Sequence, residues 1–303
     1  RTARTCRTVP SRRVRLSSTG SSWTVGDVTI TEIAEVTSLS AAHWLLPDAT
    51  ADRVREIGWM VPHYATAEGK VYMTIRALVV ESEGRRILVD TCLGNDKRRP
   101  VETWNMRSGP FLADLAAAGF APESIDTVLC THLHVDHVGW NTMLVDGEWV
   151  PTFPESRYLF AGPEYAHWSA EPFCHRPEHD DSIEPVADAG LVDLVDVDAE
   201  IAPGVSLVST PGHTPGHCSV KLSSGGSEAL ITGDFMHHAV QVASPEWCSR
   251  FDTDPVLGEA TRREFIEQHA DGDLLVIGTH FGGVGSGRIV SDDRGHVFVA
   301  AAS

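Results

Sequence analysis

The sequence predicts an α/β protein in which mixed β-sheets are covered by helices. Many short apolar segments have the length and alternation of strands, and only two long segments, 108–125 and 254–270, have a helical pattern. Each cluster of chemically active side chains follows the carboxyl end of an apolar segment, where α/β proteins tend to place their sites. Hydrophobic residues make up 42% of the 303 residues, enough for a sizeable core.

The first half of the chain alternates strands with short helices. We expect strands at 25–36, 72–82, 85–91, 126–132 and 156–162, and helices at 51–58, 108–125 and 163–170. A hairpin joins the second and third strands, because only the short turn around Glu83 and Gly84 separates the two apolar runs. Gly119 and Pro122 mark the end of the first long helix.

The second half begins with the polar, proline-containing stretch 171–185, which predicts a surface excursion. After it we expect strands at 191–196, 205–212, 218–224, 228–234, 273–280, 287–292 and 296–301. The long helix 254–270 separates the fourth of these strands from the fifth. Mixed sheets between helices satisfy this order.

The composition of the chain argues against several classes of substrate and partner. The formal net charge of −18 disfavours nucleic acid as a substrate and an anionic membrane surface as a partner. No stretch approaches the roughly 18–20 apolar residues of a membrane span. The six cysteines show no paired spacing, which favours reduced thiols and a cytoplasmic enzyme.

The first 22 residues differ from the rest of the chain, with six arginines and no acidic residue. We expect residues 1–22 to be a disordered Arg-rich tail without a role in the chemistry, and residues 23–303 to form a single domain.

The stretch Thr-His-Leu-His-Val-Asp-His at 131–137 places four metal-ligand side chains in six positions. His132 and His134, two residues apart, can point the same way, whereas Asp136 and His137 point in different directions. Imidazole and carboxylate groups are good ligands for zinc and similar ions. One loop can therefore serve two neighbouring metals.

Three further candidates follow other apolar strands. His213 lies in the turn Thr-Pro-Gly-His-Thr-Pro-Gly-His, Asp234 follows Leu-Ile-Thr-Gly, and His280 ends Val-Ile-Gly-Thr-His. Gly233, directly before Asp234, permits a close approach of the backbone. His217 is expected to support the turn rather than bind an ion.

These motifs resemble those of the metallo-β-lactamase-fold hydrolases. The matching stretches are Val-Asp-Thr at 89–91, the histidine motif at 131–139, the double Pro-Gly-His turn at 210–217, Gly-Asp at 233–234 and Gly-Thr-His at 278–280. Their order and spacing agree over about residues 23–299. The resemblance implies an αβ/βα sandwich of two mixed β-sheets flanked by helices, with the site along one edge.

The resemblance also implies two ligand groups joined by one bridging carboxylate. The first group is His132, His134 and His213, the second is Asp136, His137 and His280, and the bridge is Asp234. Two divalent ions, with zinc as the expected metal, would share a hydroxide that attacks the substrate, and Asp136 or Asp234 would relay the proton.

The long segment before His132 resembles the branch that contains the lactonases and methyl parathion hydrolase. That branch implies hydrolysis of a small ester, lactone or phosphotriester. Dimers are common in similar proteins, so a homodimer is a possible assembly, and the acidic charge leads us to expect a small-molecule substrate without a nucleic-acid or membrane partner. Similar lactonases tend to carry tyrosine at the position of His237. His237 is either a catalytic hydrogen-bond donor or a strand histidine without a role.

Two alternatives remain on the same fold. One is a mono-iron thiol or persulfide dioxygenase, and the other is a glyoxalase II-like thioester hydrolase. Aromatic residues near the motifs line a substrate pocket or belong to the core: Trp104, Trp140, Phe153, Phe235 and Phe281. His238 is expected to be structural.

Overall fold

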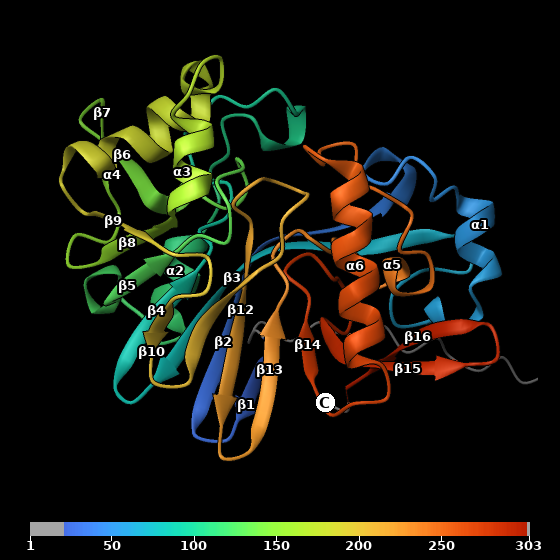
Figure 1. Ribbon diagram of the computed structural model, residues 1–303. Helices are drawn as coiled ribbons and strands as arrows, with labels where there is room; N and C mark the ends of the chain where they lie inside the picture. The colour runs from blue at the N-terminus through green and yellow to red at the C-terminus, as the bar shows by residue number, and fades with distance from the viewer. Residues whose placement is uncertain (1–20, 302–303) are drawn as a thin grey trace, which may run out of the picture.

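The computed structural model describes residues 21–301 and contains two seven-stranded sheets (Figure 1). The first sheet consists, in spatial order, of β1 (Ser22–Val25), β2 (Val28–Ala41), β3 (Lys70–Ser82), β4 (Arg85–Val89), β5 (Thr127–Leu129), β8 (Arg157–Ala161) and β9 (Val192–Val195). Its first four strands pair antiparallel, and β4, β5, β8 and β9 pair parallel. This sheet is therefore mixed, as predicted.

The second sheet consists, in spatial order, of β10 (Glu200–Ala202), β11 (Val205–Ser209), β12 (Cys218–Ser224), β13 (Ser227–Ile231), β14 (Leu275–Ile277), β15 (Ser286–Asp292) and β16 (Gly295–Ala300). Only β13 and β14 pair parallel, because α6 connects them. A separate hairpin pairs β6 (Thr142–Val145) with β7 (Glu148–Pro151).

Within the described residues, six α-helices connect or cover the strands: α1 (Ala51–Glu56), α2 (Phe111–Ala117), α3 (Gly162–Trp168), α4 (Glu184–Asp188), α5 (Val240–Ala243) and α6 (Pro255–His269). The start of α6 is specified locally, because the side chain of Asp254 accepts a hydrogen bond from the Leu257 amide and Pro255 occupies the first turn. Short 3-10 turns fill many of the remaining connections.

Three apolar clusters define the layers. One lies between the sheets and joins Ile30 and Leu78 to Val220 and Ile231. The others lie on the outer faces of the sheets, where α2 and α3 cover the first and α6 covers the second. In Figure 1, α3 and α6 accordingly lie on opposite sides of the central strands. The order helix, sheet, sheet, helix confirms the predicted αβ/βα sandwich.

Most predicted strands are present, with changes at their ends. The strand predicted at 126–132 stops at Leu129, because residues 131–139 turn away from the sheet to form the histidine loop. The helix predicted over 108–125 covers only Phe111–Ala117, followed by a 3-10 turn at Pro122–Ser124. The β6–β7 hairpin and β10 were not predicted.

The predicted surface excursion at 171–185 is wrong for its second half. Asp181, Ser182 and Ile183 are buried, and they lie in a π-helical turn that leads into α4. The Asp181 carboxylate pairs with the buried cations of Lys97 and Arg99. Polar composition suggested exposure, whereas these polar groups are buried as charge partners.

Residues 1–20 of the predicted tail lie outside the described residues, and Ser22 already belongs to β1. Across residues 21–301 all five cysteines are free. Over the same range, no helix has the length and apolar character that a membrane crossing requires.

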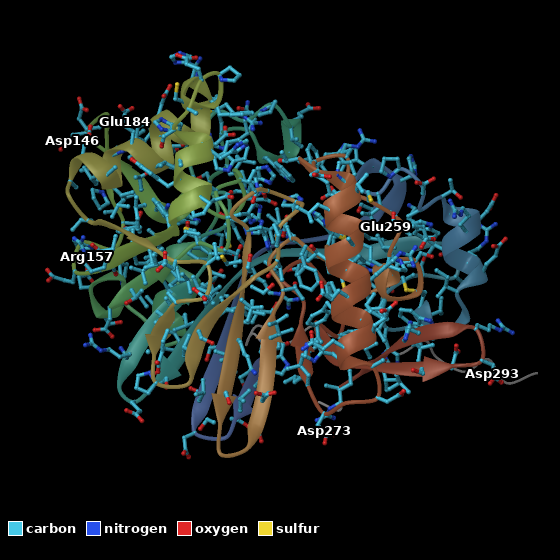
Figure 2. All side chains as sticks on the ribbon, viewed as in Figure 1. Asp146, Arg157, Glu184, Glu259, Asp273 and Asp293 are labelled. Atoms are coloured by element: carbon cyan, nitrogen blue, oxygen red, sulfur yellow. The ribbon has the colours of Figure 1, made fainter. Side chains whose placement is uncertain are left out.

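Several acidic side chains lie on the outside of the molecule. Asp146, Asp273 and Asp293 are exposed, and Figure 2 shows them at its margin.

Candidate metal centre

The seven predicted ligands all lie in loops that follow strands. The histidine loop follows β5, the loop with His213 follows β11, Asp234 follows β13, and His280 follows β14. The structure brings all seven side chains into one buried cluster (the ligand cluster: His132, His134, Asp136, His137, His213, Asp234 and His280). Residues that are far apart in the sequence therefore lie next to one another at one edge of the sandwich.

The first group is compact. Nε2 of His132 lies 3.1 Å from Nδ1 of His134, and Nε2 of His213 lies 2.8 Å from the same Nδ1 atom. Burial lowers the pKa values of all three imidazoles well below the usual range. They are therefore neutral near pH 7, as metal binding requires.

The second group lies directly beside the first. Nε2 of His137 is 3.2 Å from Nε2 of His280. The carboxylate of Asp136 faces both rings, with Oδ2 3.6 Å from His280 Nε2 and Oδ1 3.8 Å from His137 Nε2. These three side chains are those that the resemblance assigned to a second ion.

Asp234 lies between the two groups, and its two oxygens face different sides. Oδ1 is 3.0 Å from Nε2 of His280 and 3.3 Å from Nε2 of His137. Oδ2 is 3.5 Å from Nε2 of His213 and 3.8 Å from Nε2 of His132. This is the position that a bridging carboxylate occupies.

The chemistry of the cluster fits divalent metal ions. A neutral imidazole has one N–H, so several ring nitrogens turned toward each other cannot all be satisfied as hydrogen-bond donors and acceptors. Asp234 Oδ1 is buried and has no hydrogen-bond partner, which is costly unless a cation is bound there. Histidine and carboxylate ligands in this number suit zinc or a similar ion.

In three of the histidines, the Nδ1 atom, which points away from the ligand cluster, contacts an oxygen of another residue. Nδ1 of His137 contacts Asp90 at 2.9 Å, Nδ1 of His213 contacts Asp252 at 2.8 Å, and Nδ1 of His280 contacts the carbonyl oxygen of Thr74 at 2.8 Å. Partners of this kind fix the ring orientation of a metal ligand.

Sequence reasoning missed the roles of Asp252 and Thr74, and it noted Asp90 only as part of a matching strand end. Asp252 lies 39 residues after His213, and Thr74 lies 206 residues before His280. No local spacing connects residues so far apart. For Asp90 the signal was present, since the Val-Asp-Thr motif ends a strand that pairs parallel with β5.

The other histidines of the motifs divide into supporting and cavity-facing residues. His217 accepts a hydrogen bond from the Asp234 amide at 2.8 Å and so supports the Asp234 loop. Gly233 is required beside it, because its φ is +58° and a Cβ would lie 2.5 Å from His217 Nε2. His238 accepts from the Val240 amide, consistent with a structural role.

His237 belongs to the site. Its Nε2 lies 3.2 Å from Oδ2 of Asp234, and its buried Nδ1 has no hydrogen-bond partner. Sequence reasoning left its role open, and the structure places it against the proposed bridge and beside the cavity.

A cavity of about 640 Å³ lies over the ligand cluster. Its walls are mainly apolar and include Leu46, Met73 and Ile75, and its aromatic wall consists of Trp44, Trp104 and Phe251. The rings of Trp44 and Trp104 meet edge to face at 5.9 Å. Of the five aromatic candidates from the sequence only Trp104 lines this cavity, whereas Trp140, Phe153, Phe235 and Phe281 are buried in the core.

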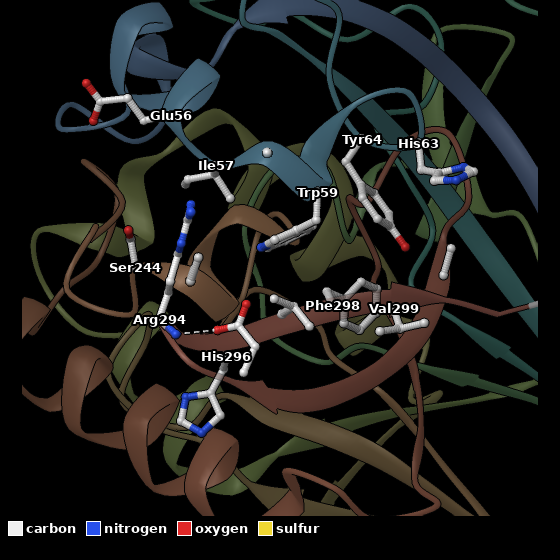
Figure 3. A pocket seen from close by; sticks show the side chains of 15 residues that line it. Glu56, Ile57, Trp59, His63, Tyr64, Ser244, Arg294, His296, Phe298 and Val299 are labelled. Carbon is white, nitrogen blue, oxygen red and sulfur yellow. Dashed lines mark hydrogen bonds between the residues drawn. The ribbon is translucent and has the colours of Figure 1, made fainter.

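A second cavity, of about 590 Å³, lies between the 3-10 turn Gly58–Met60 and β16 (Figure 3). Trp59 and Phe298 form apolar walls, and Arg294 reaches over one side. None of its lining residues belongs to the ligand cluster, so the first cavity is the one connected to the metal chemistry.

Known metallo-hydrolases and lactonases are similar to this chain in sequence. N-acyl homoserine lactonase from Bacillus thuringiensis is 29% identical over 117 residues, which are 39% of this chain and 40% of that protein. A probable metallo-hydrolase from Mycobacterium tuberculosis is 27% identical over 184 residues, 55% of this chain and 58% of that protein. The chain thus spans about half the length of the curated relatives it matches.

Solved structures have the same architecture. Hydrolase AbOPH, described as a member of the beta lactamase superfamily, superposes with a TM-score of 0.79 at 25% identity, covering 95% of this chain and 99% of that one. AidC, a dizinc quorum-quenching lactonase in complex with a product, superposes with a TM-score of 0.76 at 20% identity, covering 94% and 99%. The second likeness shows the fold alone.

The family profile covers the whole site. The profile of the Metallo-beta-lactamase superfamily matches residues 74–280, which begin at the residue that orients His280 and end at His280 itself. Together with the sandwich of two mixed sheets and the ligand loops at one edge, this match over more than half of the sequence shows that the chain belongs to the Metallo-beta-lactamase superfamily.

Proposed function

We propose that the protein is a dinuclear metal-dependent hydrolase that cleaves a small ester, lactone or phosphotriester. The observation that carries the proposal is the position of Asp234, whose two oxygens face two separate ligand groups beneath an apolar cavity. A single-metal site would use one of these two oxygens and leave the other group of ligands without an ion. Zinc is the metal we expect.

When bound, a pair of divalent ions lowers the pKa of a shared water toward about 7 and polarises the substrate carbonyl or phosphoryl oxygen. His132, His134 and His213 would hold one ion, and Asp136, His137 and His280 the other, with Asp234 between them. The orienting contacts of Asp90, Asp252 and the Thr74 carbonyl keep these ligands in place.

Side chains of the protein would accept the proton of the attacking water and stabilise the charge that develops on the substrate. The Asp136 side chain is 14% exposed, against 5% for Asp234, so Asp136 is the carboxylate more open to the cavity. We assign proton acceptance to Asp136 and bridging to Asp234. His237, with one ring nitrogen facing Asp234 and the other unpartnered, is positioned to donate a hydrogen bond to the oxygen on which charge develops.

The cavity and the relatives favour an uncharged organic substrate. Apolar walls bury a hydrophobic acyl or aryl group, and the relatives whose names state a substrate are N-acyl homoserine lactonases. A lactone is therefore the first substrate class to test. A cytoplasmic location and a homodimer remain predictions.

The test combines metal analysis with a substrate panel. We expect about two zinc-like ions per purified chain, and turnover of one lactone, one aryl ester or one phosphotriester. Asp234→Ala should lose most of the metal and nearly all turnover, since the remaining imidazoles lose their shared anion. Asp293→Ala, which removes an exposed carboxylate, is the control and should match the wild type.

Other results would identify the alternatives. One iron per chain with oxygen uptake on a thiol or persulfide would identify the dioxygenase. Selective turnover of a thioester would identify the glyoxalase II-like hydrolase. Full activity and full metal content in Asp234→Ala would rule out the site.

A further inference from the structure

Helix α6 packs directly on the loop that carries His213. The two backbones approach so closely at Gly212 and Gly258 that a Cβ on Gly212 would lie 2.3 Å from the Gly258 nitrogen. Thr261 on α6 donates a hydrogen bond to the Pro211 carbonyl at 2.7 Å. The helix therefore serves as a platform for this ligand loop.

Arg262 is the residue of α6 that points into this contact, and it is fully buried. Its Nε donates to the carbonyl of Pro245 at 2.9 Å, and its Nη1 donates to the carbonyl of Phe235 at 3.2 Å. Phe235 directly follows Asp234. One guanidinium group thus holds the backbone of the loop that carries the proposed bridging carboxylate.

The same guanidinium reaches the second ligand loop through a carboxylate. Nη1 of Arg262 lies 3.5 Å from Oδ2 of Asp252, and Oδ1 of Asp252 contacts Nδ1 of His213 at 2.8 Å. The side chains of both charged residues are 0% exposed. A buried ion pair of this kind is costly to break, so the arrangement is stiff.

Asp252 acts on the opposite side of the His213 ring from the ligand cluster. Nε2 of His213 faces Nδ1 of His134, whereas Nδ1 faces Asp252. An ion held at Nε2 and the carboxylate of Asp252 therefore use different atoms of the imidazole. A carboxylate beside Nδ1 accepts a hydrogen bond from Nδ1–H and so leaves the Nε2 lone pair directed at the ion.

We propose that Arg262 is a positioning residue that sets two ligand loops at once. Through Asp252 it fixes the ring orientation and the Nδ1–H tautomer of His213, and through the Phe235 carbonyl it fixes the loop of Asp234. The inference rests on the metal binding in the proposed function. According to this proposal, helix α6 contributes no ligand but affects how tightly the first ligand group binds its ion.

The experiment measures zinc affinity by competition with a chromophoric chelator, using the metal-free full chain. Asp252→Asn keeps the shape of the side chain but loses its charge, and Arg262→Lys keeps the charge but loses the branched guanidinium. Each should weaken the binding of one zinc ion roughly 10- to 100-fold, the range seen when a residue that orients a metal ligand is changed.

Arg263→Lys is the matched control. Arg263 is the next residue of the same helix, but its side chain is 47% exposed and pairs with Glu259 and Glu246. Its zinc affinity should equal that of the wild type. Thermal unfolding of the metal-free variants separates the roles, because a merely structural change lowers the Tm while the folded protein keeps its zinc affinity.

Two results would overturn the inference. The first is wild-type affinity for both zinc ions in folded Asp252→Asn or Arg262→Lys. The second needs no variant: the ¹⁵N spectrum of wild-type imidazoles should show the His213 proton on Nδ1, and a proton on Nε2 would contradict the assignment. Failure of the wild type to bind zinc would reject the proposed function instead, and the ¹⁵N spectrum would still decide the tautomer.

Discussion

At the residue scale, the protonation states of the candidate site depend on burial and on the charges of neighbouring imidazoles and carboxylates. Burial lowers the pKa values of His132, His134 and His213. Burial acts on Asp234 in the opposite direction, but the neighbouring rings of His280 and His137 outweigh it and lower the pKa of its carboxyl group well below the usual range. His132, His134 and His213 are therefore neutral, and Asp234 is ionised, as binding of a divalent cation requires. Burial also disfavours protonation of His137 and His280, but the nearby carboxylates outweigh it and raise the pKa values of both rings, so these two rings must release a proton before they bind an ion.

His237 provides the prediction at this scale. His237→Ala should lower kcat by about 10²-fold or more, because a hydrogen-bond donor to the developing charge is lost. Its zinc content should stay at the wild-type level, since His237 is outside the proposed ligand set. The measurement is turnover on one lactone, one aryl ester and one phosphotriester, with metal analysis of each sample.

His296→Ala removes an imidazole that lies outside the ligand cluster and is the control. His237→Tyr restores the residue that similar lactonases tend to carry and should favour acyl homoserine lactones relative to the other esters. Wild-type turnover of His237→Ala on all three substrates would leave this histidine without a catalytic role.

At the element scale, the loop after β4 is fastened to the turn before α4 by buried charges. Arg99 contacts both carboxylate oxygens of Asp181, at 2.6 and 2.9 Å. Nζ of Lys97 donates to the Asp181 carbonyl at 2.8 Å and lies 3.8 Å from the centre of the Trp149 ring. The same loop continues to Trp104 at the wall of the cavity. These contacts therefore position part of the substrate wall.

Asp181→Asn tests this fastening. Removing the anion leaves the buried guanidinium of Arg99 without its partner, which costs about 3–5 kcal/mol of the free energy of unfolding. Asp193→Asn is the matched control, because Asp193 forms an exposed pair with Arg157 that is worth about 0–1 kcal/mol. Urea unfolding of the metal-free proteins measures both. Equal small losses would show that Asp181 is not needed to hold the loop.

Because Lys97 is buried, we expect the free energy of unfolding to depend on pH. Burial lowers the pKa of Lys97 to about 7, although Asp181 opposes the shift, whereas an unfolded lysine has a pKa near 10.4. Between these values the unfolded chain holds a proton that the folded protein has lost. The free energy of unfolding therefore rises with pH over this window, by up to about 1.4 kcal/mol per pH unit from this group.

Lys97→Met should lack that rise. Urea unfolding of the metal-free wild type and variant at pH 7, 8 and 9 measures the difference between them, which should grow in favour of the wild type as pH increases. Lys221→Met, at an exposed lysine paired with Glu228, should keep the wild-type pH dependence. Parallel curves for the wild type and Lys97→Met would contradict the prediction.

At the scale of the whole molecule, sequence periodicity predicted the elements that depend on local pattern. The apolar run of β3 and the helix α6 were placed within two residues, whereas the alternating run of β2 was predicted to end at residue 36 and continues to Ala41. The seven candidate ligands could be named from the sequence because motif chemistry is local and each motif follows a strand, and their role as metal ligands stays a prediction. The buried part of 171–185 was not predicted, since its burial depends on Lys97 and Arg99, more than 80 residues away.

The same limit applies to the surroundings of the site. Asp252 and Arg262 act on His213 only after α6 has packed on the loop, and no spacing rule encodes that contact. The walls of the cavity also come from distant segments, with Trp44 in one connection and Phe251 in another. Local sequence specifies which side chains can bind metal, and tertiary packing specifies how they are oriented.

The cluster links metal binding to the stability of the whole fold. Its ligands come from both sheets, so an ion bound between them stabilises only the folded state, by about 2.7 kcal/mol at 100 times Kd. We therefore expect a chelator to lower the Tm of the purified protein and zinc to restore it, with the gain saturating near two equivalents. Differential scanning fluorimetry against zinc concentration is the measurement.

The same linkage gives the direction of the pH effect. Zinc competes with protons for the imidazoles of the folded protein. Burial opposes protonation of His137 and His280, but the nearby carboxylates outweigh it and raise the pKa values of both rings, so the gain in Tm should shrink as pH falls and these protons become harder to displace. Asp234→Ala should show little gain at any pH, because the shared anion is absent. A Tm that chelator and zinc leave unchanged at pH 7.5 would mean that the seven side chains do not form a metal centre.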